Sequence, residues 1–319
     1  MSEGIIWYLP FEESLIVWLQ QLGAGTALQK VLFYLNNFFS FLGEEVVCIA
    51  VMGFLFWGID KKKGERLGVA ILLVNVGIGL LKNIFARLRP WIVSDRIELL
   101  RDVDGFSFPS GHSANCTALY PTLAYEYKHT KALVWVAVFV PLLCGISRCY
   151  VGAHWPTDVL IGWCTGLAIF ALTEVALHKT KNKFVFYLIV IAVSSVGLFY
   201  CTTNDYYNSY GMLIGCVAGL YLEEKKVRFA NTNNLWLALL RTVIGGALYF
   251  GLNSVIKIFI GGIFPEGTQG YLLMRAVRYG IVIFLLIGVY PMSFRLENKL
   301  FHAGVKNARD PAADGDAAE

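Results

Sequence analysis

Residues 67–86 read LGVAILLVNVGIGLLKNIFA, a run of 20 residues in which Lys82 is the only charged side chain. As a helix, a run of this length crosses the roughly 30 Å hydrocarbon core of a bilayer. Further apolar blocks occupy most of the remaining chain, at 24–42, 44–60, 112–127, 132–147, 158–177, 184–200, 209–222, 235–261 and 271–290. The sequence therefore predicts an all-α, polytopic membrane bundle of about nine transmembrane helices.

The composition excludes an ordinary soluble domain. Of the 319 residues, 56% are hydrophobic and only 16% are charged, and the mean hydropathy is +0.57. A soluble domain has about a quarter charged residues. The 7 cysteines form no CxxC pair and lie mostly in apolar blocks, so we interpret them as packing residues. The net charge of +4 is modest, and we expect membrane lipids as partners and no nucleic acid.

The two ends of the chain differ from its middle. Residues 5–42 mix aromatic, acidic and amide side chains, a pattern typical of helices that lie in the membrane interface. We therefore expect interfacial amphipathic helices and a possible first span in 1–43. Residues 44–178 are predicted to form a core of membrane helices that carries the motifs described below, and 179–300 additional transmembrane helices. The segment 301–319 is predicted to be a disordered cytoplasmic tail.

Basic residues indicate the orientation of the spans. If every apolar block from residue 44 onward crosses the membrane, 16 of the 27 Lys and Arg residues fall on one side. They are Lys61, Lys62, Lys63, Arg66, Lys128, Lys131, Lys179, Lys181, Lys183, Lys225, Lys226, Arg228, Arg295, Lys299, Lys306 and Arg309. By the positive-inside rule this side is cytoplasmic, with the N-terminus outside and the C-terminus inside. We expect an integral protein of a bacterial plasma membrane, with the endoplasmic reticulum as the alternative.

Three motifs lie on the opposite, outer side of this layout. They read Lys82-x6-Arg89-Pro90, then Pro109-Ser110-Gly111-His112, then Ser147-Arg148-x5-His154-x3-Asp158. The segments 87–111 and 148–157 that contain most of them carry arginines against the orienting trend. Basic groups that oppose the trend are more often functional than those that follow it, so we expect the chemistry here.

The cations of these motifs are suited to hold an anion. Lys82, Arg89 and Arg148 have no acidic partner at helical spacing, so as uncompensated charges they would repel one another unless they share an anion. The two guanidinium groups can bind phosphate oxygens as planar forks. Ser110 and Gly111 add a hydroxyl and a closely approaching backbone N–H at the start of a helix. The motifs therefore predict a cage for a phosphoryl group.

Two histidines and an aspartate supply the remaining chemistry. His154 and Asp158 are four residues apart and share one face of a helix. A carboxylate that holds one imidazole nitrogen as N–H leaves the other nitrogen free to attack phosphorus. His112 can protonate the departing alkoxide and afterwards activate water. We expect these three residues to be catalytic and the site to need no metal and no other cofactor.

The three motifs resemble those of the type-2 phosphatidic acid phosphatase superfamily, over about residues 45–175 and with no departure from its pattern. The resemblance implies a histidine-dependent membrane phosphatase in which His154 is the nucleophile, Asp158 supports it and His112 is acid and base. It implies that the other motif residues bind phosphate, namely Lys82, Arg89, Ser110, Gly111 and Arg148. It also implies independence of divalent metal. The helices after residue 180 resemble the layout of the glucose-6-phosphatase and sphingoid-base-phosphate phosphatase branches.

On this basis we expect residues 44–178 to be the catalytic core of a phosphatase. The substrate is expected to be a phosphorylated lipid, a monoester or a diphosphate, whose headgroup enters a site at the non-cytoplasmic face. A phosphatase of a soluble sugar phosphate is the alternative enzyme. A non-catalytic lipid transporter or binding protein of the same fold is the other alternative, although the intact His112, His154 and Asp158 argue against it. The sequence leaves the exact substrate and the oligomeric state open.

The remaining basic residues on the outer side have no motif position. We expect Arg87, Arg96 and Arg101 to bind lipid headgroups, gather anionic substrate or snorkel to the membrane surface, with the last two favoured. Three cations near the outer ends of the last spans can shape a substrate entrance, bind a second anionic group or simply snorkel. They are Lys257, Arg275 and Arg278.

Overall fold

The computed structural model describes residues 4–294. The helices in this range are α1 (Pro10–Gln21), α2 (Ala27–Phe41), α3 (Glu45–Gly53), α4 (Lys61–Phe85), α5 (Pro90–Val93), α6 (Gly111–Glu126), α7 (Lys131–Tyr150), α8 (Pro156–Lys179), α9 (Lys183–Ser194), α10 (Asn204–Leu222), α11 (Leu235–Ile260) and α12 (Gln269–Phe284). Short π-helical or 3-10 segments continue α3 (Phe54–Ile59), α9 (Ser195–Phe199), α10 (Glu223–Val227) and α12 (Leu285–Val289 and Tyr290–Ser293). The described residues contain no strand, so the predicted all-α class is confirmed. The predicted tail, 301–319, and the last basic group from Arg295 onward lie outside these residues.

Five helices of the described chain are long and apolar enough to cross a membrane: α4, α7, α8, α11 and α12 with its continuation. The helices α2 and α3 pass the same test only together, as a pair bent by 50°, which makes up to 6 candidate spans. The chain is therefore an integral membrane protein. The predicted number of about nine spans is not confirmed, because α6 has 16 residues, α9 has 12 and α10 opens with the polar Asn204 and Asp205.

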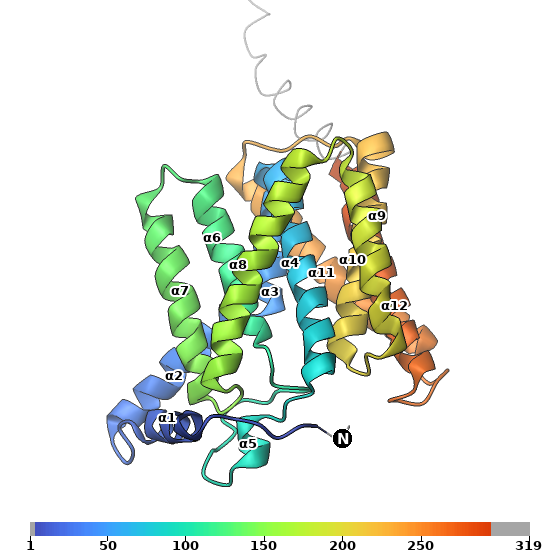
Figure 1. The fold of residues 1–319 in the computed structure, drawn as a ribbon. Helices are drawn as coiled ribbons and strands as arrows, with labels where there is room; N and C mark the ends of the chain where they lie inside the picture. Colours follow the sequence, from blue (N-terminus) through green and yellow to red (C-terminus); the bar gives the residue numbers. More distant parts are fainter. Residues whose placement is uncertain (1–3, 295–319) are drawn as a thin grey trace, which may run out of the picture.

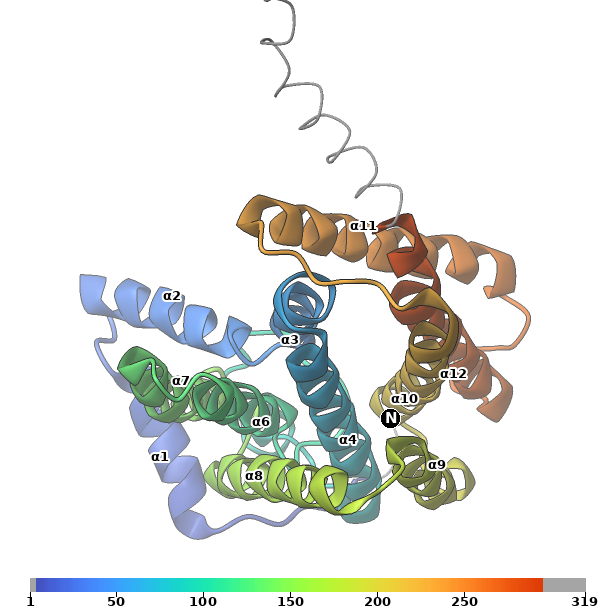
Figure 2. The same cartoon turned by 90° about the horizontal axis from the view of Figure 1, so that it is seen from above.

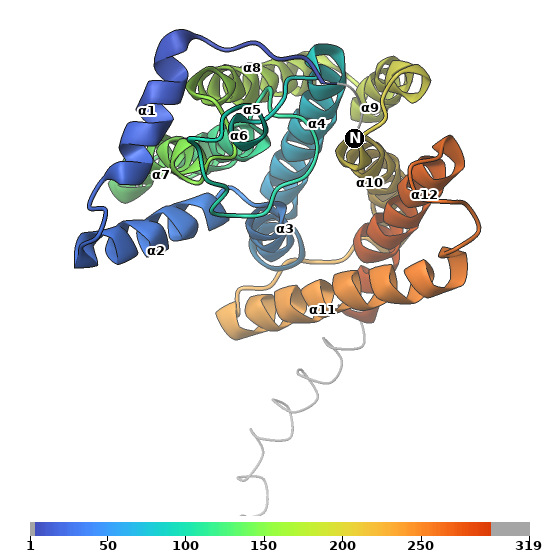
Figure 3. The same ribbon diagram turned by 90° about the horizontal axis from the view of Figure 1, so that it is seen from below.

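Helix α4 lies at the centre of the bundle. It packs against α6 and α8 on one side and against α10 on the other, and Figure 2 shows it between these two groups. The helices α1 and α5 lie across the lower end of the bundle in Figure 1, and Figure 3 shows them in front of the core helices. The first helices thus run across the bundle axis. Their predicted place in a membrane interface stays a prediction.

Small residues bring α8 close enough to α6 to join two of the motifs. A Cβ at Gly162 of α8 would lie 2.6 Å from the carbonyl oxygen of Ser110, and one at Gly166 would collide with the carbonyl of Ala114. Glycine at these positions lets the helix backbones touch. As a result the backbone N–H of Ser110 donates to the carbonyl oxygen of Asp158 at 2.9 Å.

The C-terminal helices are attached to the core by the same kind of contact. A Cβ at Gly79 of α4 would lie 2.9 Å from Cα of Tyr206, and one at Gly211 of α10 would collide with the carbonyl of Ala276 in α12. The first turn of α10 is therefore held against the end of α4 that carries Lys82.

The opposite end of the bundle carries the basic loops. Lys61 Nζ lies 2.7 Å from Glu223 Oε1, and Arg66 Nη1 lies 3.0 Å from Glu126 Oε1. The helices α4, α9 and α11 begin at this end, and α6, α8 and α10 finish there (Figure 1). Within the described chain, the loops that were predicted to share one side of the membrane therefore do lie at one end.

Candidate active site

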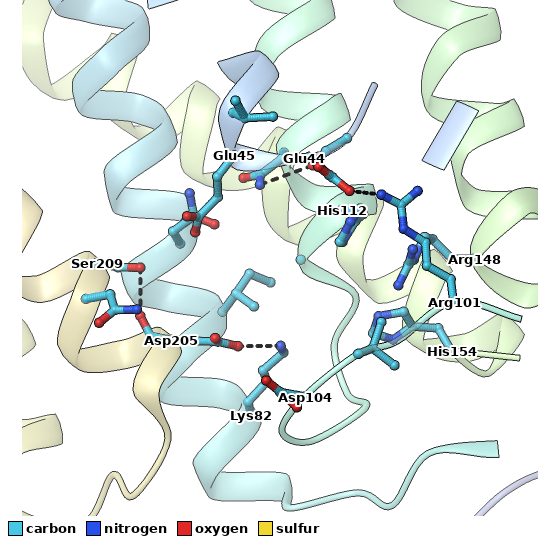
Figure 4. Close-up of a pocket in the computed structure, with 18 of the residues that line it drawn as sticks. Glu44, Glu45, Lys82, Arg101, Asp104, His112, Arg148, His154, Asp205 and Ser209 are labelled. Atoms are coloured by element: carbon cyan, nitrogen blue, oxygen red, sulfur yellow. Dashed lines mark hydrogen bonds and ion pairs between the residues drawn. The ribbon is translucent and has the colours of Figure 1, made fainter. Parts of the chain in front are cut away.

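The three motifs converge on one cavity of about 410 Å³ (Figure 4). The motif residues on its wall are Lys82, Arg89, Gly111, His112, Arg148 and His154. Ser110 and Asp158 are fully buried and lie behind this wall, beside the residues that line it. Segments nearly eighty residues apart in the chain therefore meet where the motifs predicted a phosphoryl cage.

Arg148 of α7 presents free hydrogen-bond donors to the cavity. Its side chain is fully buried, and Nη1 donates to Ser40 Oγ at 2.5 Å. Nε and Nη2 are buried without any partner. Leaving charged donors unsatisfied in a buried position costs free energy that a bound anion would recover. This guanidinium therefore has the geometry of an anion site that is ready for its ligand.

The guanidinium of Arg89, which precedes α5, donates to backbone carbonyls, whereas it was predicted to bind phosphate oxygens. Its Nε donates to the carbonyl of Gly105 at 2.8 Å, Nη1 to that of Ala153 at 2.8 Å and Nη2 to that of Asp104 at 2.5 Å. Nη1 also lies 3.5 Å from Nε2 of His154. Burial lowers the pKa of Arg89 to about 10, so it stays charged at neutral pH. Most of its donors order the loops around His154, and its charge faces the ring.

Lys82 of α4 has an acidic partner that the motifs did not reveal. Its Nζ lies 2.9 Å from Oδ2 of Asp205, at the start of α10, and Figure 4 shows this pair on the side of the cavity opposite His154. The prediction of three uncompensated cations is therefore wrong for Lys82. The partner lies 123 residues away in sequence, so helical spacing could not indicate it.

His154 lies in the loop between α7 and α8, with its two ring nitrogens in different surroundings. Nδ1 is 3.5 Å from Oδ2 of Asp158, and Nε2 faces Arg89. The first separation is longer than a hydrogen bond, as is common in a site without substrate. Burial, and then the charges of Arg89, Arg148 and Lys82, lower the pKa of His154 well below its usual value. The ring is therefore neutral at physiological pH.

Ser110 caps helix α6 rather than facing the cavity. Its Oγ accepts hydrogen bonds from the N–H of Ser113 at 3.4 Å and from Ser113 Oγ at 2.9 Å. Gly111 and His112 follow in the first turn of α6 and line the cavity. A Cβ at Gly43 would lie 2.9 Å from the carbonyl of His112, so the turn before α3 packs directly on this histidine. Contact of the Ser110 hydroxyl with phosphate stays a prediction.

Arg87 lies in the interior of the protein, whereas it was expected at the membrane surface. It is fully buried, not at the membrane surface, and its Nη2 lies 2.8 Å from Glu12 Oε2 while Nη1 lies 2.5 Å from Asp158 Oδ1. Asp158 also accepts from the Ser107 hydroxyl and from the N–H of Trp155. The N-terminal helix α1 is thereby linked, through one arginine, to the carboxylate beside His154. Glu12 lies 75 residues before Arg87 in the chain, so no local pattern indicated this pair.

The other two non-motif arginines of the 87–111 segment also have acidic neighbours. Arg101 lines the cavity and pairs with Glu44. Arg96 has a mostly exposed side chain, with Nη1 3.5 Å from Oε1 of Glu13. Arg96 thus lies at the surface as predicted, whereas Arg101 belongs to the wall of the site.

The cations of the last spans lie farther from the motif residues. Arg275 Nε donates to Oδ1 of Asn208 at 3.1 Å, and Asn208 lines the cavity. Arg278 is buried with Nε unpartnered, and Lys257 is exposed near the end of α11. Arg275 thus touches a residue of the cavity wall, and the effect of the three cations on a substrate entrance stays a prediction.

The described residues hold no group of three or more His, Cys, Asp or Glu side chains arranged for a metal ion. The cysteines, all of which fall in the described range, carry free thiols, and each except Cys164 is buried. This agrees with their interpretation as packing residues.

Comparison with known proteins supports the family suggested by the motifs. Phosphatidylglycerophosphatase B of Bacillus subtilis (strain 168) is 38% identical over 125 residues, which cover 36% of this chain and 60% of that protein. Sphingosine-1-phosphate phosphatase 2 of Mus musculus is 33% identical over 148 residues, covering 44% and 41%. Undecaprenyl-diphosphatase of Sulfolobus acidocaldarius is 29% identical over 161 residues, covering 46% and 75%. The chain therefore spans less than two thirds of the length of the first two relatives.

Two family models match consecutive parts of the chain. The PAP2 superfamily model matches residues 65–182, which contain all three motifs. The model of the PAP2 superfamily phosphatase transmembrane extension matches residues 207–299, which include most of α10 and all of α11 and α12. The chain accordingly belongs to the PAP2 superfamily and carries the transmembrane extension of its phosphatases.

Proposed function

We propose that this protein is a membrane-embedded hydrolase that removes phosphate from a lipid phosphate monoester or diphosphate, through a phosphohistidine on His154. The observation that carries the proposal is the pair of unpartnered donors of Arg148 in the same cavity as the His154 ring. A phosphoryl group bound by those donors would lie against a neutral imidazole, which is the form that can attack phosphorus. Lys82, which pairs with Asp205, and the charge of Arg89 line the same cavity and can add to the stabilisation of the transferring group.

In the first step Nε2 of His154 attacks phosphorus, because Nδ1 faces Asp158 and keeps its proton there. The P–N bond forms as the P–O bond to the alcohol breaks. His112, which starts this step as an imidazolium because the charge of the bound phosphate favours its protonation, gives a proton to the departing oxygen. In the second step His112 takes a proton from water, the water oxygen attacks phosphorus, and the P–N bond breaks. Inorganic phosphate is released and both histidines return to their starting forms.

The roles of the remaining residues follow from their contacts. Asp158 is held by donors from Arg87, Ser107 and Trp155, so its carboxylate is fixed where it can orient His154. Gly111 offers close backbone approach at the beginning of α6, where the Ser110 cap orders the first turn. We infer that Arg87 is a positioning residue rather than a phosphate ligand.

A lipid substrate is favoured by the relatives and by the position of the site. The three relatives described above are named for phosphatidylglycerophosphate, sphingosine 1-phosphate and undecaprenyl diphosphate, each of which is a lipid. The site lies between helix ends of an apolar bundle, so a headgroup can enter it while its chains stay in the bilayer. A soluble sugar phosphate is the alternative substrate, and a phosphate-binding protein without turnover is the non-enzymatic alternative.

We place the active site at the non-cytoplasmic face of a bacterial plasma membrane, with the endoplasmic reticulum as the alternative. The six candidate spans, counted with α2 and α3 as one, and α6, α9 and α10 make nine crossings. In support, α6, α9 and α10 run between the two ends of the bundle in Figure 1, and the basic loops lie at the end remote from the cavity. The positive-inside rule makes that remote end cytoplasmic.

The experiment that tests this function is phosphate release by the purified protein in mixed micelles. We expect hydrolysis of a lipid phosphate to persist in EDTA, because the proposed steps use histidines alone, and to be inhibited by vanadate, which imitates the transferring phosphoryl group. Sugar phosphates assayed in parallel should react far more slowly. Loss of activity in EDTA, restored by a divalent metal, would contradict the mechanism; phosphate binding without release from any ester would favour the non-enzymatic alternative.

Arg148→Lys is expected to lower kcat/KM by about 100-fold to 1,000-fold, the effect of losing one aligned donor to a developing charge. Lysine keeps the positive charge but cannot place two donors side by side as Nε and Nη2 do. Steady-state kinetics on one lipid phosphate measures the loss. Arg96→Lys is the matched control, because Arg96 is exposed and outside the cavity. Equal activity of the two variants would remove Arg148 from the phosphate site.

A further inference from the structure

A second cavity, of about 240 Å³, continues from the active site between helices α3 and α11. Glu45 and Val46, at the beginning of α3, line both cavities, so the two spaces meet there. Figure 3 shows α3 beside α11 at the outer edge of the bundle. A space therefore lies between the catalytic core and the C-terminal extension, next to the active site.

We call this space the α3–α11 groove and define it by its apolar lining, Val46, Ile49, Ala50, Gly246, Tyr249 and Phe250. On each helix the lining residues recur three and four positions apart, so each helix contributes one continuous face. The edges are open, since Val46 is 37% exposed and Phe250 is 57% exposed. In a bilayer these edges would face lipid.

The two helices pack closely beside the groove. A Cβ at Gly58, just beyond α3, would lie 2.6 Å from Cβ of Ala238 in α11, and one at Gly245 would collide with the ring of Trp57. No heavy atom lies within 4 Å of a Cβ placed at Gly246, the next residue of α11. Gly245 therefore faces the helix contact, whereas Gly246 faces the open space of the groove.

Two hydrogen-bond acceptors of the active-site cavity have no partner within residues 4–294. The first is the Glu45 carboxylate, which is exposed to the cavity where the two spaces meet, and Figure 4 shows it at the end of the cavity away from His154. Asn115, one turn after His112 on α6, lines the same cavity, is only 3% exposed and has Oδ1 without a partner. The buried Asn115 acceptor is costly unless a ligand supplies a donor, whereas the Glu45 carboxylate is open to the cavity and free to accept from a ligand there.

We propose that the α3–α11 groove holds the hydrocarbon chain of the substrate next to its ester, and that Glu45 and Asn115 accept hydrogen bonds from a donor group on the same part of the lipid. The inference rests on the proposed phosphatase function and names its substrate class: a lipid phosphate that carries an ammonium or a hydroxyl near the phosphate. A carboxylate favours the ammonium. The extension helix α11 would then be part of the substrate site.

The groove is expected to act by shape rather than by hydrophobic affinity. A chain that moves from bilayer lipid into an apolar groove leaves one hydrocarbon environment for another, so little is gained by burial. A side chain that fills the groove should therefore obstruct a long chain and leave a short one unaffected.

The test compares Gly246→Leu with Gly251→Leu in the purified full chain. Both glycines lie on α11 with no heavy atom near an added Cβ, but Gly251 lines neither cavity, so it is the matched control. The substrates are hexadecyl phosphate in mixed micelles and butyl phosphate in solution. We expect Gly246→Leu to lower kcat/KM for hexadecyl phosphate about tenfold or more, with butyl phosphate unchanged and the control unchanged on both.

An equal loss on both substrates, or no loss on hexadecyl phosphate, would overturn the groove as a chain site. Absence of phosphate release from either ester by the unsubstituted protein would instead overturn the proposed function. The two failures are therefore distinguishable.

The polar part is tested by Glu45→Gln with three esters of one chain length: 2-aminohexadecyl, 2-hydroxyhexadecyl and hexadecyl phosphate. The unsubstituted protein should prefer the amino ester to the plain ester by about tenfold, with the hydroxy ester between them. Glu45→Gln should remove most of the preference for the amino ester and less of that for the hydroxy ester, because an amide still accepts a hydrogen bond. Equal rates on the three esters before substitution would overturn the role of Glu45 and Asn115.

Discussion

Replacement of His154 by glutamine is expected to lower phosphate release by roughly 10,000-fold or more, since the proposed intermediate cannot form without the imidazole. The rest of the site should survive. Arg148 would still present Nε and Nη2 to the cavity, and Lys82 would still pair with Asp205. The variant should therefore keep its affinity for inorganic phosphate or vanadate while losing turnover.

Single-turnover trapping with a radiolabelled lipid phosphate gives the direct measurement. The unsubstituted protein should form an acid-labile phosphoenzyme, and His154→Gln should form none. His178→Gln is the matched control, because His178 is exposed at the other end of α8, where its Nδ1 lies beside the carbonyl of Glu174. Turnover by His154→Gln within tenfold of the control would show that another group is the nucleophile.

Asp158→Asn is expected to lower kcat by about 1,000-fold to 10,000-fold with little change in KM. The side chain lies behind the cavity wall and not in it, so it acts on the substrate only through His154. An amide in its place can present its NH2 group to Nδ1 and so select the wrong tautomer of the ring. It also removes one of the two carboxylates that neutralise the buried Arg87.

Because it removes this carboxylate, Asp158→Asn should also lower the stability of the protein. A control variant can separate this loss of stability from the loss of kcat. We expect the free energy of unfolding to fall by about 3 kcal/mol, the lower end for a broken buried ion pair, because Glu12 still neutralises Arg87. Glu12→Gln breaks the other half of the same network without touching Asp158 or His154. It should show a similar fall in thermal stability in detergent but less than a tenfold fall in kcat. A comparable fall in kcat for both variants would make Asp158 a structural residue only.

The site residues that were predictable are those whose spacing is local. His154 and Asp158 are one helical turn apart, and Ser110 to His112 form the beginning of one helix, so short-range periodicity was enough to group them. Their contacts with other elements were not predictable in this way. Arg87 was expected at the membrane surface because an arginine outside a motif has no partner until the position of α1 is known. The cap that the Ser110 hydroxyl forms for α6 is likewise seen only in the structure, and its contact with phosphate stays a prediction.

The number of spans was likewise only partly predictable from the sequence. Apolar length identified α4, α7, α8, α11 and α12, which meet the requirement for crossing on their own. It could not classify α2 and α3, because they pass the same test only together, across a bend of 50°.

The amino-acid sequence by itself determined the apolar helices, the basic loops at one end of them and the three motifs, since each depends on residues close together in the chain. Only the tertiary structure decided that Asp205 pairs with Lys82, that Glu12 and Asp158 share Arg87, and that α11 borders a groove beside the site. These contacts join segments far apart in the chain, and the packing that creates them leaves no local pattern in the sequence.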